Sequence, residues 1–283
     1  MAGQRIGIVH PGQMGIVVAV SARKSGNEVF WASEKRSAST RERATRAGLS
    51  DAGTLSSLCG LCSLIVSVCP PEFAEPVADQ VARCSFQGTY LDANAISVER
   101  TQRIARRMEE CGARFVDGGI IGPAVTERNR TWLYLSGEHA AGIAPCFSAG
   151  PIEVQTLGGG IGQASALKMC FAAYSKGSIA LASAVLAAAE QLEVLEDLKR
   201  QWARSGPALP ELEREIARAA PKAWRFSGEM REIAATFQSA GMPAGFHQAA
   251  EQIFGSLAGF KGREQLTLEE ILDALVSGAT LRK

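Results

Sequence analysis

A glycine-containing turn near the start of the chain has the spacing of a phosphate-binding loop. Gly12 and Gly15 follow an apolar run over residues 5–9 and precede an apolar segment typical of a helix. In such a turn glycine lets backbone N–H groups approach a pyrophosphate, and the N-terminus of the following helix favours the anion. His10 stands where a further glycine is usual, so the pattern is incomplete. The spacing predicts a dinucleotide site, with an ordinary strand-to-helix turn as the alternative.

The residues that follow a second apolar run, at 28–32, indicate which dinucleotide would bind. Ser33, Arg36 and Ser37 suit a 2′-phosphate, because hydroxyl groups and a guanidinium bind phosphate oxygens. This favours NADP, while Glu34 keeps NAD as the alternative, since an acidic residue can bind the ribose diol. A solvated surface loop is the other interpretation of these charges. The expected cofactor contacts here are His10, Gly12, Gln13, Met14, Gly15, Ser33, Arg36 and Ser37.

Asn94 follows a later strand-like run and is a candidate contact for the cofactor or the substrate. Open α/β sheets bind ligands at the carboxyl ends of their strands, where this residue would lie. Asparagine at a strand end is equally typical of a turn. Both interpretations remain open for this position.

Composition limits the classes of partner. Thirty basic and 29 acidic side chains give a net charge of +1, so bulk charge favours neither nucleic acid nor an anionic membrane. No leader precedes the first apolar run, and we therefore expect a cytoplasmic protein. Seven cysteines, an odd number, indicate reduced thiols. Cys59 and Cys62 have metal-ligand spacing, but without a second pair or a nearby histidine we expect buried thiols and no metal.

Short β-rich runs alternate with helical stretches in the first half of the chain, which predicts an α/β fold with a doubly wound parallel sheet. Strands are expected at 5–9, 28–32, 64–69, 89–92, 114–117, 132–136 and 152–156, and a helix at 97–111. After the glycines at 158–160 only helical patterns follow. We therefore expect a dinucleotide-binding Rossmann domain at 1–158 and an all-α substrate and dimerisation domain at 159–283.

Residues 163–190 are so rich in alanine and leucine that a helix there would be apolar around most of its circumference. Such a helix must be buried. Lys168 and Lys176 argue against a simple membrane span, so we expect a long helix between two domains or at a dimer interface, and no membrane partner.

Four segments occur in the order seen in the β-hydroxyacid dehydrogenases: HPGQMG (10–15), DANAIS (92–97), DGGIIGP (117–123) and GQASALK (162–168). The chain most resembles the branch that joins a 6-phosphogluconate dehydrogenase NAD-binding-like domain to a C-terminal domain of unknown function. The resemblance covers nearly the whole chain, because KAWRF (222–226), GEM (228–230) and GFH (245–247) also look like that branch.

The resemblance implies a homodimer with an active site in a cleft between domains, acting on a small-molecule substrate. It implies Lys168 as the acid/base group, since an ammonium can stabilise and protonate the alkoxide that forms when a carbonyl accepts hydride. A lysine that only covers apolar surface or pairs with a carboxylate is the alternative. The resemblance also implies cofactor contacts from Cys69 and Pro70 and substrate contacts from Gly118, Gly119 and Gly122, for which a tight loop is the alternative. Asn94 and His247 are the other candidate substrate contacts, because Asn94 follows a strand and His247 follows a glycine in a helical segment that could face the cleft.

Two departures from the family pattern put the substrate in question. Ala172 stands where the family usually carries an asparagine, and Pro123, which has no N–H, stands in a segment that often binds a carboxylate. Three hypotheses follow: a dehydrogenase acting on a small hydroxy acid or its oxo form, an imine reductase on the same fold, and a non-catalytic NADP-binding protein.

Overall fold

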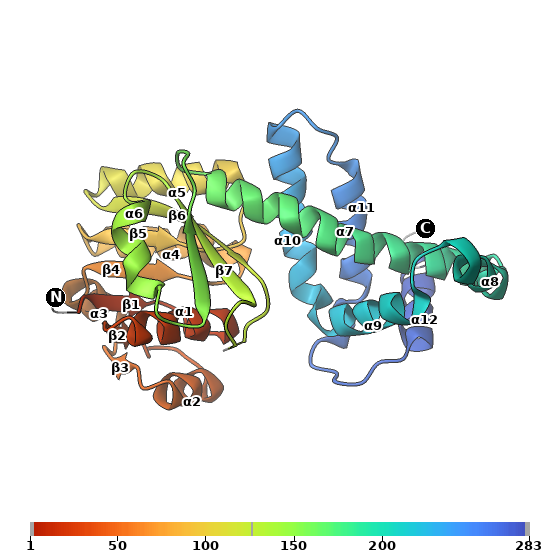
Figure 1. Ribbon diagram of the computed structural model, residues 1–283, viewed down its shortest axis with the longest axis horizontal. Coiled ribbons are helices and arrows are strands. Elements are labelled where there is room, and N and C mark those ends of the chain that lie inside the picture. The colour runs from red at the N-terminus through yellow and green to blue at the C-terminus, as the bar shows by residue number, and fades with distance from the viewer. Residues whose placement is uncertain (1–2, 126, 281–283) are drawn as a thin grey trace. The chain divides into compact units, whose positions relative to one another are not determined.

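The computed structural model describes residues 3–125 and 127–280, and the chain divides into two compact units at Met169 and Cys170. The first unit holds the sheet and the second is helical (Figure 1). The strands are β1 (Arg5–Ile8), β2 (Glu28–Trp31), β3 (Ser50–Asp51), β4 (Leu64–Ser67), β5 (Thr89–Asp92), β6 (Arg114–Ile121), β7 (Thr131–Ser136) and β8 (Ile152–Thr156). The helices are α1 (Gln13–Lys24), α2 (Ala38–Arg46), α3 (Leu55–Leu61), α4 (Ala74–Arg83), α5 (Val98–Glu110), α6 (Ala140–Ile143), α7 (Gln163–Gln191), α8 (Leu195–Ser205), α9 (Leu209–Ala219), α10 (Ala223–Ser239), α11 (Gly245–Ser256) and α12 (Leu268–Thr280).

The sheet has the strand order β3-β2-β1-β4-β5-β6-β7-β8. Neighbouring strands from β3 to β6 are parallel, β7 is antiparallel to β6, and β8 is parallel to β7. The predicted α/β class is therefore confirmed, with a sheet that is mostly rather than wholly parallel. The sequence analysis does not predict β3, which has two exposed residues. The strand predicted at 114–117 extends four residues further, to Ile121.

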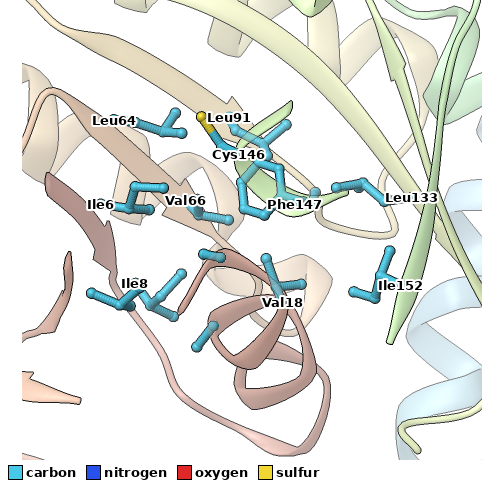
Figure 2. Packing of buried hydrophobic residues seen from close by; sticks show 14 of the residues in the cluster. Ile6, Ile8, Val18, Leu64, Val66, Leu91, Leu133, Cys146, Phe147 and Ile152 are labelled. Carbon is cyan, nitrogen blue, oxygen red and sulfur yellow. The ribbon is translucent and has the colours of Figure 1, made fainter. Parts of the chain in front are cut away.

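Strand side chains alternate between two buried hydrophobic clusters. On β4, Leu64 and Val66 belong to the cluster that includes α1, whereas Ile65 belongs to the cluster formed with α3, α4 and α5. Figure 2 shows the first cluster, in which Val18 of α1 lies near residues of several strands. A fully buried aliphatic side chain of this kind contributes about 1.5–3 kcal/mol to folding. Helices on both faces therefore hold the strand ends in place.

Local sequence explains where α5 begins and ends. Ser97 occupies the N-cap, Glu99 lies in the first turn, and Ile104 and Met108 are buried on one face. Gly112, with φ +88°, follows the end of the helix in a left-handed conformation that glycine adopts at little cost. The predicted helix at 97–111 is confirmed.

The second unit contains helices and no strand among its described residues. α10 and α11 pack together through the edge-on contact of Phe226 and Phe254, whose ring centroids lie 5.4 Å apart. Among the described residues, α7 alone is long and apolar enough to cross a membrane by length and composition. The unit boundary falls within α7, so residues 159–169, which the sequence analysis assigned to the second domain, pack with the first unit.

Candidate functional site

The turn after β1 leaves the start of α1 open. The N-cap of α1 is Gly12, which donates its backbone N–H to the His10 carbonyl at 2.8 Å and receives no side-chain cap. A Cβ added at Gly12 would meet nothing within 4 Å, whereas one at Gly15 would lie 2.2 Å from the His10 carbonyl oxygen. Gly15 thus permits close packing of helix and turn, and Gly12 leaves room for a ligand above the free amides.

A cavity of about 300 Å³ lies beside this turn. One wall is apolar and comes from the start of α3 and from η1 (Pro71–Phe73) with α4, while the other is polar and comes from the loop after β2. Its volume is at the lower end of those typical of small-molecule sites. The lining residues are His10, Ala32, Glu34, Lys35, Arg36, Leu55, Phe73, Pro76, Val77 and Gln80.

Two nitrogen atoms of this lining are buried without a hydrogen-bond partner, Nδ1 of His10 and Nε of Arg36. Burial, together with the nearby Arg36 guanidinium, lowers the pKa of His10 to about 4, so the imidazole is neutral near pH 7. Burial also lowers the pKa of Arg36, which still carries its charge. An unpaired guanidinium nitrogen in a cavity fits an anionic ligand group, so these residues are compatible with a nucleotide phosphate.

Ser33 and Ser37 have roles within the protein itself. Ser37 caps α2, because its Oγ accepts the Thr40 backbone N–H at 3.3 Å. The Ser33 side chain is buried, and its carbonyl accepts a hydrogen bond from Arg41 at 2.7 Å. Contact of either hydroxyl with a cofactor stays a prediction.

Sequence reasoning missed two arginines of α2 that reach the loops around the cavity. Arg41 holds the Ser33 carbonyl, and Arg43 donates to the Pro11 carbonyl of the phosphate turn at 3.3 Å. Two arginines on one helix shortly after Arg36 could have indicated a role near the cavity, but arginines on such a helix more often face solvent. Gln13 and Met14 begin α1, where Gln13 is exposed and Met14 packs partly against the core.

A row of buried polar side chains crosses the sheet at the ends of β4 and β5. Ser67, Asp92, Asp117 and Ser136 are register partners on four neighbouring strands. All four are at most 2% exposed. Asp92 accepts the Asn94 backbone N–H at 3.0 Å through one oxygen, while its other oxygen has no partner. Burial raises the pKa of Asp92 to about 7.

Asp117 fixes the start of α7 to the sheet. Its carboxylate accepts the backbone N–H groups of Gly162 at 3.0 Å and Ser165 at 3.1 Å, and the Ser165 hydroxyl at 2.6 Å. Ser136 donates to the same carboxylate at 2.9 Å and accepts the Ala164 N–H at 3.1 Å. Side chains of β6 and β7 therefore satisfy three backbone donors that would be unpaired at the helix N-terminus.

Lys168 lies one turn further along α7, against β6. A Cβ added at Gly119 would lie 2.5 Å from the Ala164 carbonyl oxygen and 3.2 Å from Lys168 Cβ, so only glycine lets the helix approach this closely. Lys168 itself is half-buried. The geometry places it near the carboxyl end of β6, in the same unit as the phosphate turn.

Close contacts also explain why the other two candidate positions, 118 and 122, are occupied by glycine. A Cβ at Gly118 would lie 2.9 Å from a methyl carbon of Leu91, and Gly122, with φ +120°, approaches the Arg130 carbonyl. Gly118 and Gly119 are buried within β6 rather than in a loop. Their contact with a substrate stays a prediction.

Asn94 holds the loop that contains Cys69 and Pro70. Its side-chain oxygen accepts the Cys69 backbone N–H at 2.6 Å, and its amide nitrogen donates to Ser67 Oγ at 3.1 Å. Asn94 is only 2% exposed, and Cys69 and Pro70 are half-buried. These contacts show the turn chemistry that the sequence left open, and a ligand contact stays a prediction.

His247 belongs to α11 of the second unit. It is buried between Phe237, at 4.3 Å between ring centroids, and Phe246, at 5.3 Å. Burial lowers its pKa, and Nδ1 has no hydrogen-bond partner. In the same unit Lys176 forms an ion pair with Glu229 at 2.8 Å. A role of His247 in substrate binding stays a prediction.

Two family models match the chain. The NAD-binding domain of 6-phosphogluconate dehydrogenase matches residues 5–149, and a domain of unknown function, DUF1932, matches residues 189–257. A curated relative from Methanothermus fervidus, described as an uncharacterized 28.5 kDa protein in the 7S RNA 5′ region, is 27% identical over 195 residues, or 69% of this chain and 74% of its own length.

Solved structures share the fold over nearly the whole chain. The conserved protein MTH1747, of unknown function and described as similar to 3-hydroxyacid dehydrogenases, is 26% identical with a TM-score of 0.66, covering 90% of this chain and 97% of its own. The 3-hydroxyisobutyrate dehydrogenase of Mycobacterium tuberculosis is 14% identical with a TM-score of 0.69, covering 99% and 100%. A reductive aminase from Aspergillus terreus, solved with NADPH, is 16% identical with a TM-score of 0.55, covering 96% and 99%.

Proposed function

This chain belongs to the family defined by the NAD-binding domain of 6-phosphogluconate dehydrogenase, and from that premise we propose that it is an NADP-dependent oxidoreductase acting on a small hydroxy acid or its oxo form. The observation that carries the proposal is the uncapped start of α1 beside a cavity with two unpartnered nitrogen atoms. Free amides at a helix N-terminus favour a pyrophosphate, and the cavity offers space for the adenosine end of the cofactor.

Arg36 is the main support for NADP over NAD. Its guanidinium lines the cavity with an unpaired Nε, and Lys35 adds a second positive charge. Glu34 lines the same cavity and opposes a 2′-phosphate, so NAD remains the alternative cofactor. A titration that compares NADPH with NADH decides between them.

Lys168 is the proposed acid/base group. When bound, the nicotinamide cofactor would supply or accept the hydride. Lys168 Nζ would give a proton to the substrate oxygen during reduction and take it back during oxidation. The packing of α7 on Gly119 and the hydrogen bonds to Asp117 hold the backbone that carries this lysine. Asn94, Gly118, Gly119, Gly122 and His247 are the proposed substrate contacts.

Turnover on a substrate panel tests this proposal. Purified protein should reduce one or more small oxo acids with NADPH, or oxidise the matching hydroxy acids with NADP. Lys168→Ala should lower kcat by roughly 10²–10⁴-fold and leave the NADPH dissociation constant unchanged. Lys168→Arg is the matched control, because it keeps the charge but does not release a proton at neutral pH. Full turnover by Lys168→Ala would remove the lysine from the mechanism.

Imine reduction is the second candidate, favoured by one position. Ala172 is fully buried one turn after Lys168 and offers no hydrogen bond where the resembling dehydrogenases carry asparagine. The reductive aminase of similar fold was solved with NADPH. Cyclic imines belong in the same panel, and turnover confined to them favours this candidate. NADPH binding without turnover of any compound favours a non-catalytic NADP-binding protein.

We also propose a cytoplasmic homodimer that uses α7 as part of its interface. Leu167, Phe171, Tyr174 and Leu181 are 36–82% exposed and recur at helical spacing along α7. Burial of this stripe by a second copy would remove apolar surface from water. Light scattering on protein purified without detergent should give twice the chain mass. A monomer, or a chain that needs detergent to stay in solution, contradicts the proposal.

A further inference from the structure

Four cysteines gather on the face of the sheet covered by α3, α4 and α5. Cys59 and Cys62 are buried in the hydrophobic cluster of that face, and Cys84 and Cys111 pack against it partly buried. Cys62, Cys84 and Cys111 follow the ends of α3, α4 and α5. The thiols therefore lie towards the amino ends of the strands, away from the phosphate turn.

Two of these thiols are neighbours. Cys59 and Cys84 interact electrostatically, and they come from helices α3 and α4, which cover the same hydrophobic cluster. Cys59 is 8% exposed, whereas Cys84 is half-exposed and donates to the Gln80 carbonyl at 3.3 Å. Burial raises the pKa of Cys59 to about 12, so Cys59 stays a thiol while Cys84 meets solvent first.

On both helices the cysteine lies one turn after a residue that lines the cavity. Leu55 and Gln80 line the cavity, and each lies one helical turn before a member of the pair, Cys59 or Cys84. Residues four apart share one face of a helix. The same faces of α3 and α4 therefore form part of the cavity wall and, one turn later, bring the two thiols together.

We propose that Cys59 and Cys84 are an oxidisable pair whose disulfide ties α3 to α4 below the cavity. A hydroperoxide is the oxidant. The Cys84 thiol loses its proton to solvent and the thiolate attacks the peroxide. The O–O bond breaks, one oxygen stays on Cys84 as the sulfenic acid, and the leaving alkoxide or hydroxide takes up a proton to become an alcohol or water. The Cys59 sulfur then bonds to Cys84 Sγ, the S–O bond breaks, and water leaves with the Cys59 proton. A dithiol reverses the reaction by thiol–disulfide exchange.

The disulfide should weaken cofactor binding, a consequence that rests on the proposed function. An S–S bond of about 2.05 Å is much shorter than a contact between two thiols, so its formation draws the two helices together. One turn away, this movement narrows the cavity between Leu55 and Gln80. We expect the oxidised protein to bind NADPH about fivefold more weakly than the reduced protein, and a dithiol to restore the affinity.

Peptide mapping by mass spectrometry tests the pairing directly on the wild-type full-length chain. After treatment with hydrogen peroxide and alkylation of the remaining thiols, the peptides that contain Cys59 and Cys84 should appear joined, lighter by two hydrogen atoms than their sum. Cys84→Ser should abolish the joined peptide, and Cys170→Ser, which changes an exposed cysteine of the second unit, should retain it. Free Cys59 after oxidation, or its pairing with Cys62 or Cys111, overturns the proposal.

NADPH titration of the same samples tests the link to the cavity. Oxidation should weaken binding by the wild type and by Cys170→Ser, and leave binding by Cys84→Ser unchanged. Equal affinity of oxidised and reduced wild type overturns the link even where the disulfide forms. A reduced protein that does not bind NADPH counts against the proposed function alone, because the peptide map still decides whether the pair forms.

Discussion

The first backbone N–H groups of α1 and of α7 have no acceptor within their own helices, and the two helix ends differ in what surrounds these groups. At α7 the side chains of Asp117 and Ser136 accept the backbone N–H groups of Gly162, Ala164 and Ser165. At α1 the N-cap is Gly12, with no side-chain cap and open space around it. Both helix ends attract negative charge. In α7 the protein supplies the hydrogen-bond acceptors, whereas in α1 the amides remain available for the phosphate of a ligand.

This difference separates two parts of the candidate site. The filled N-terminus fixes α7, and with it Lys168, against β6. The open one is the proposed cofactor site, and it lacks the side-chain hydrogen bonds that stabilise the other. Changes at Asp117 should therefore act on stability, and changes at Gly12 on cofactor binding.

Removal of the carboxyl group that caps α7 should have the largest effect. Asp117→Ala leaves two backbone amides and two hydroxyl groups without their buried acceptor, and should lower the free energy of unfolding by roughly 3–5 kcal/mol. Urea unfolding measures the change. Asp117→Asn is the control, because its oxygen can keep the three bonds now made to Oδ2. A loss for Asn as large as that for Ala would show that charge, rather than hydrogen bonding, holds the helix.

Asp92, the neighbour of Asp117 in the polar row, is a buried carboxyl group that does not cap a helix, and its burial has a cost in stability. Its pKa is raised from 3.8 to about 7 by burial, so its contribution to stability is present below about pH 4 and is lost as the pH rises through 7. Asp92→Asn should gain roughly 2–4 kcal/mol relative to wild type between pH 4 and pH 8. The free energy of unfolding of both proteins, measured at several pH values, gives the gain. If the two free energies change with pH in parallel, the prediction is wrong.

Filling the open N-terminus should abolish most cofactor binding while the protein stays folded. Gly12→Asp places a carboxylate where the pyrophosphate is proposed, and should weaken NADPH binding about 100-fold. Its thermal stability should be unchanged or higher, since a Cβ fits there and aspartate is a good N-cap. Gly12→Asn is the neutral control with a smaller loss. Unchanged NADPH affinity in Gly12→Asp would place the cofactor elsewhere.

The smallest effect concerns cofactor preference. Arg36→Gln removes the guanidinium from the cavity and should weaken NADPH binding about tenfold while NADH binding changes little. Fluorescence titration with both cofactors gives the ratio. Equal losses for the two cofactors would show that Arg36 binds a group other than the 2′-phosphate.

Much of the fold could be predicted because apolar runs of four to eight residues, separated by glycine and polar turns, mark buried strands. Strands β5 and β8 were predicted to the residue. The two-residue β3 carries no such run, and the reversal of β7 depends on pairing with β6 that local sequence does not encode.

The candidate site was predictable only where spacing along the chain carries the signal. The turn at Gly12 and Gly15 is of this kind. The role of Asp117 is not, because it joins β6 to residues 45 and 48 positions later. A carboxylate inside the apolar run FVDGGII was the available clue. The cavity wall likewise combines residues of several loops and helices that only the folded chain brings together.

A crystal structure of the protein soaked with NADPH is the most direct test of the contrast between the two helix ends. We expect the pyrophosphate about 3 Å from the backbone nitrogen atoms at the start of α1, with the 2′-phosphate beside Arg36. The start of α7 should keep its hydrogen bonds to Asp117 and Ser136 and bind no part of the nucleotide. A nucleotide bound elsewhere, or a well-ordered α1 with no nucleotide at millimolar NADPH, would contradict the account.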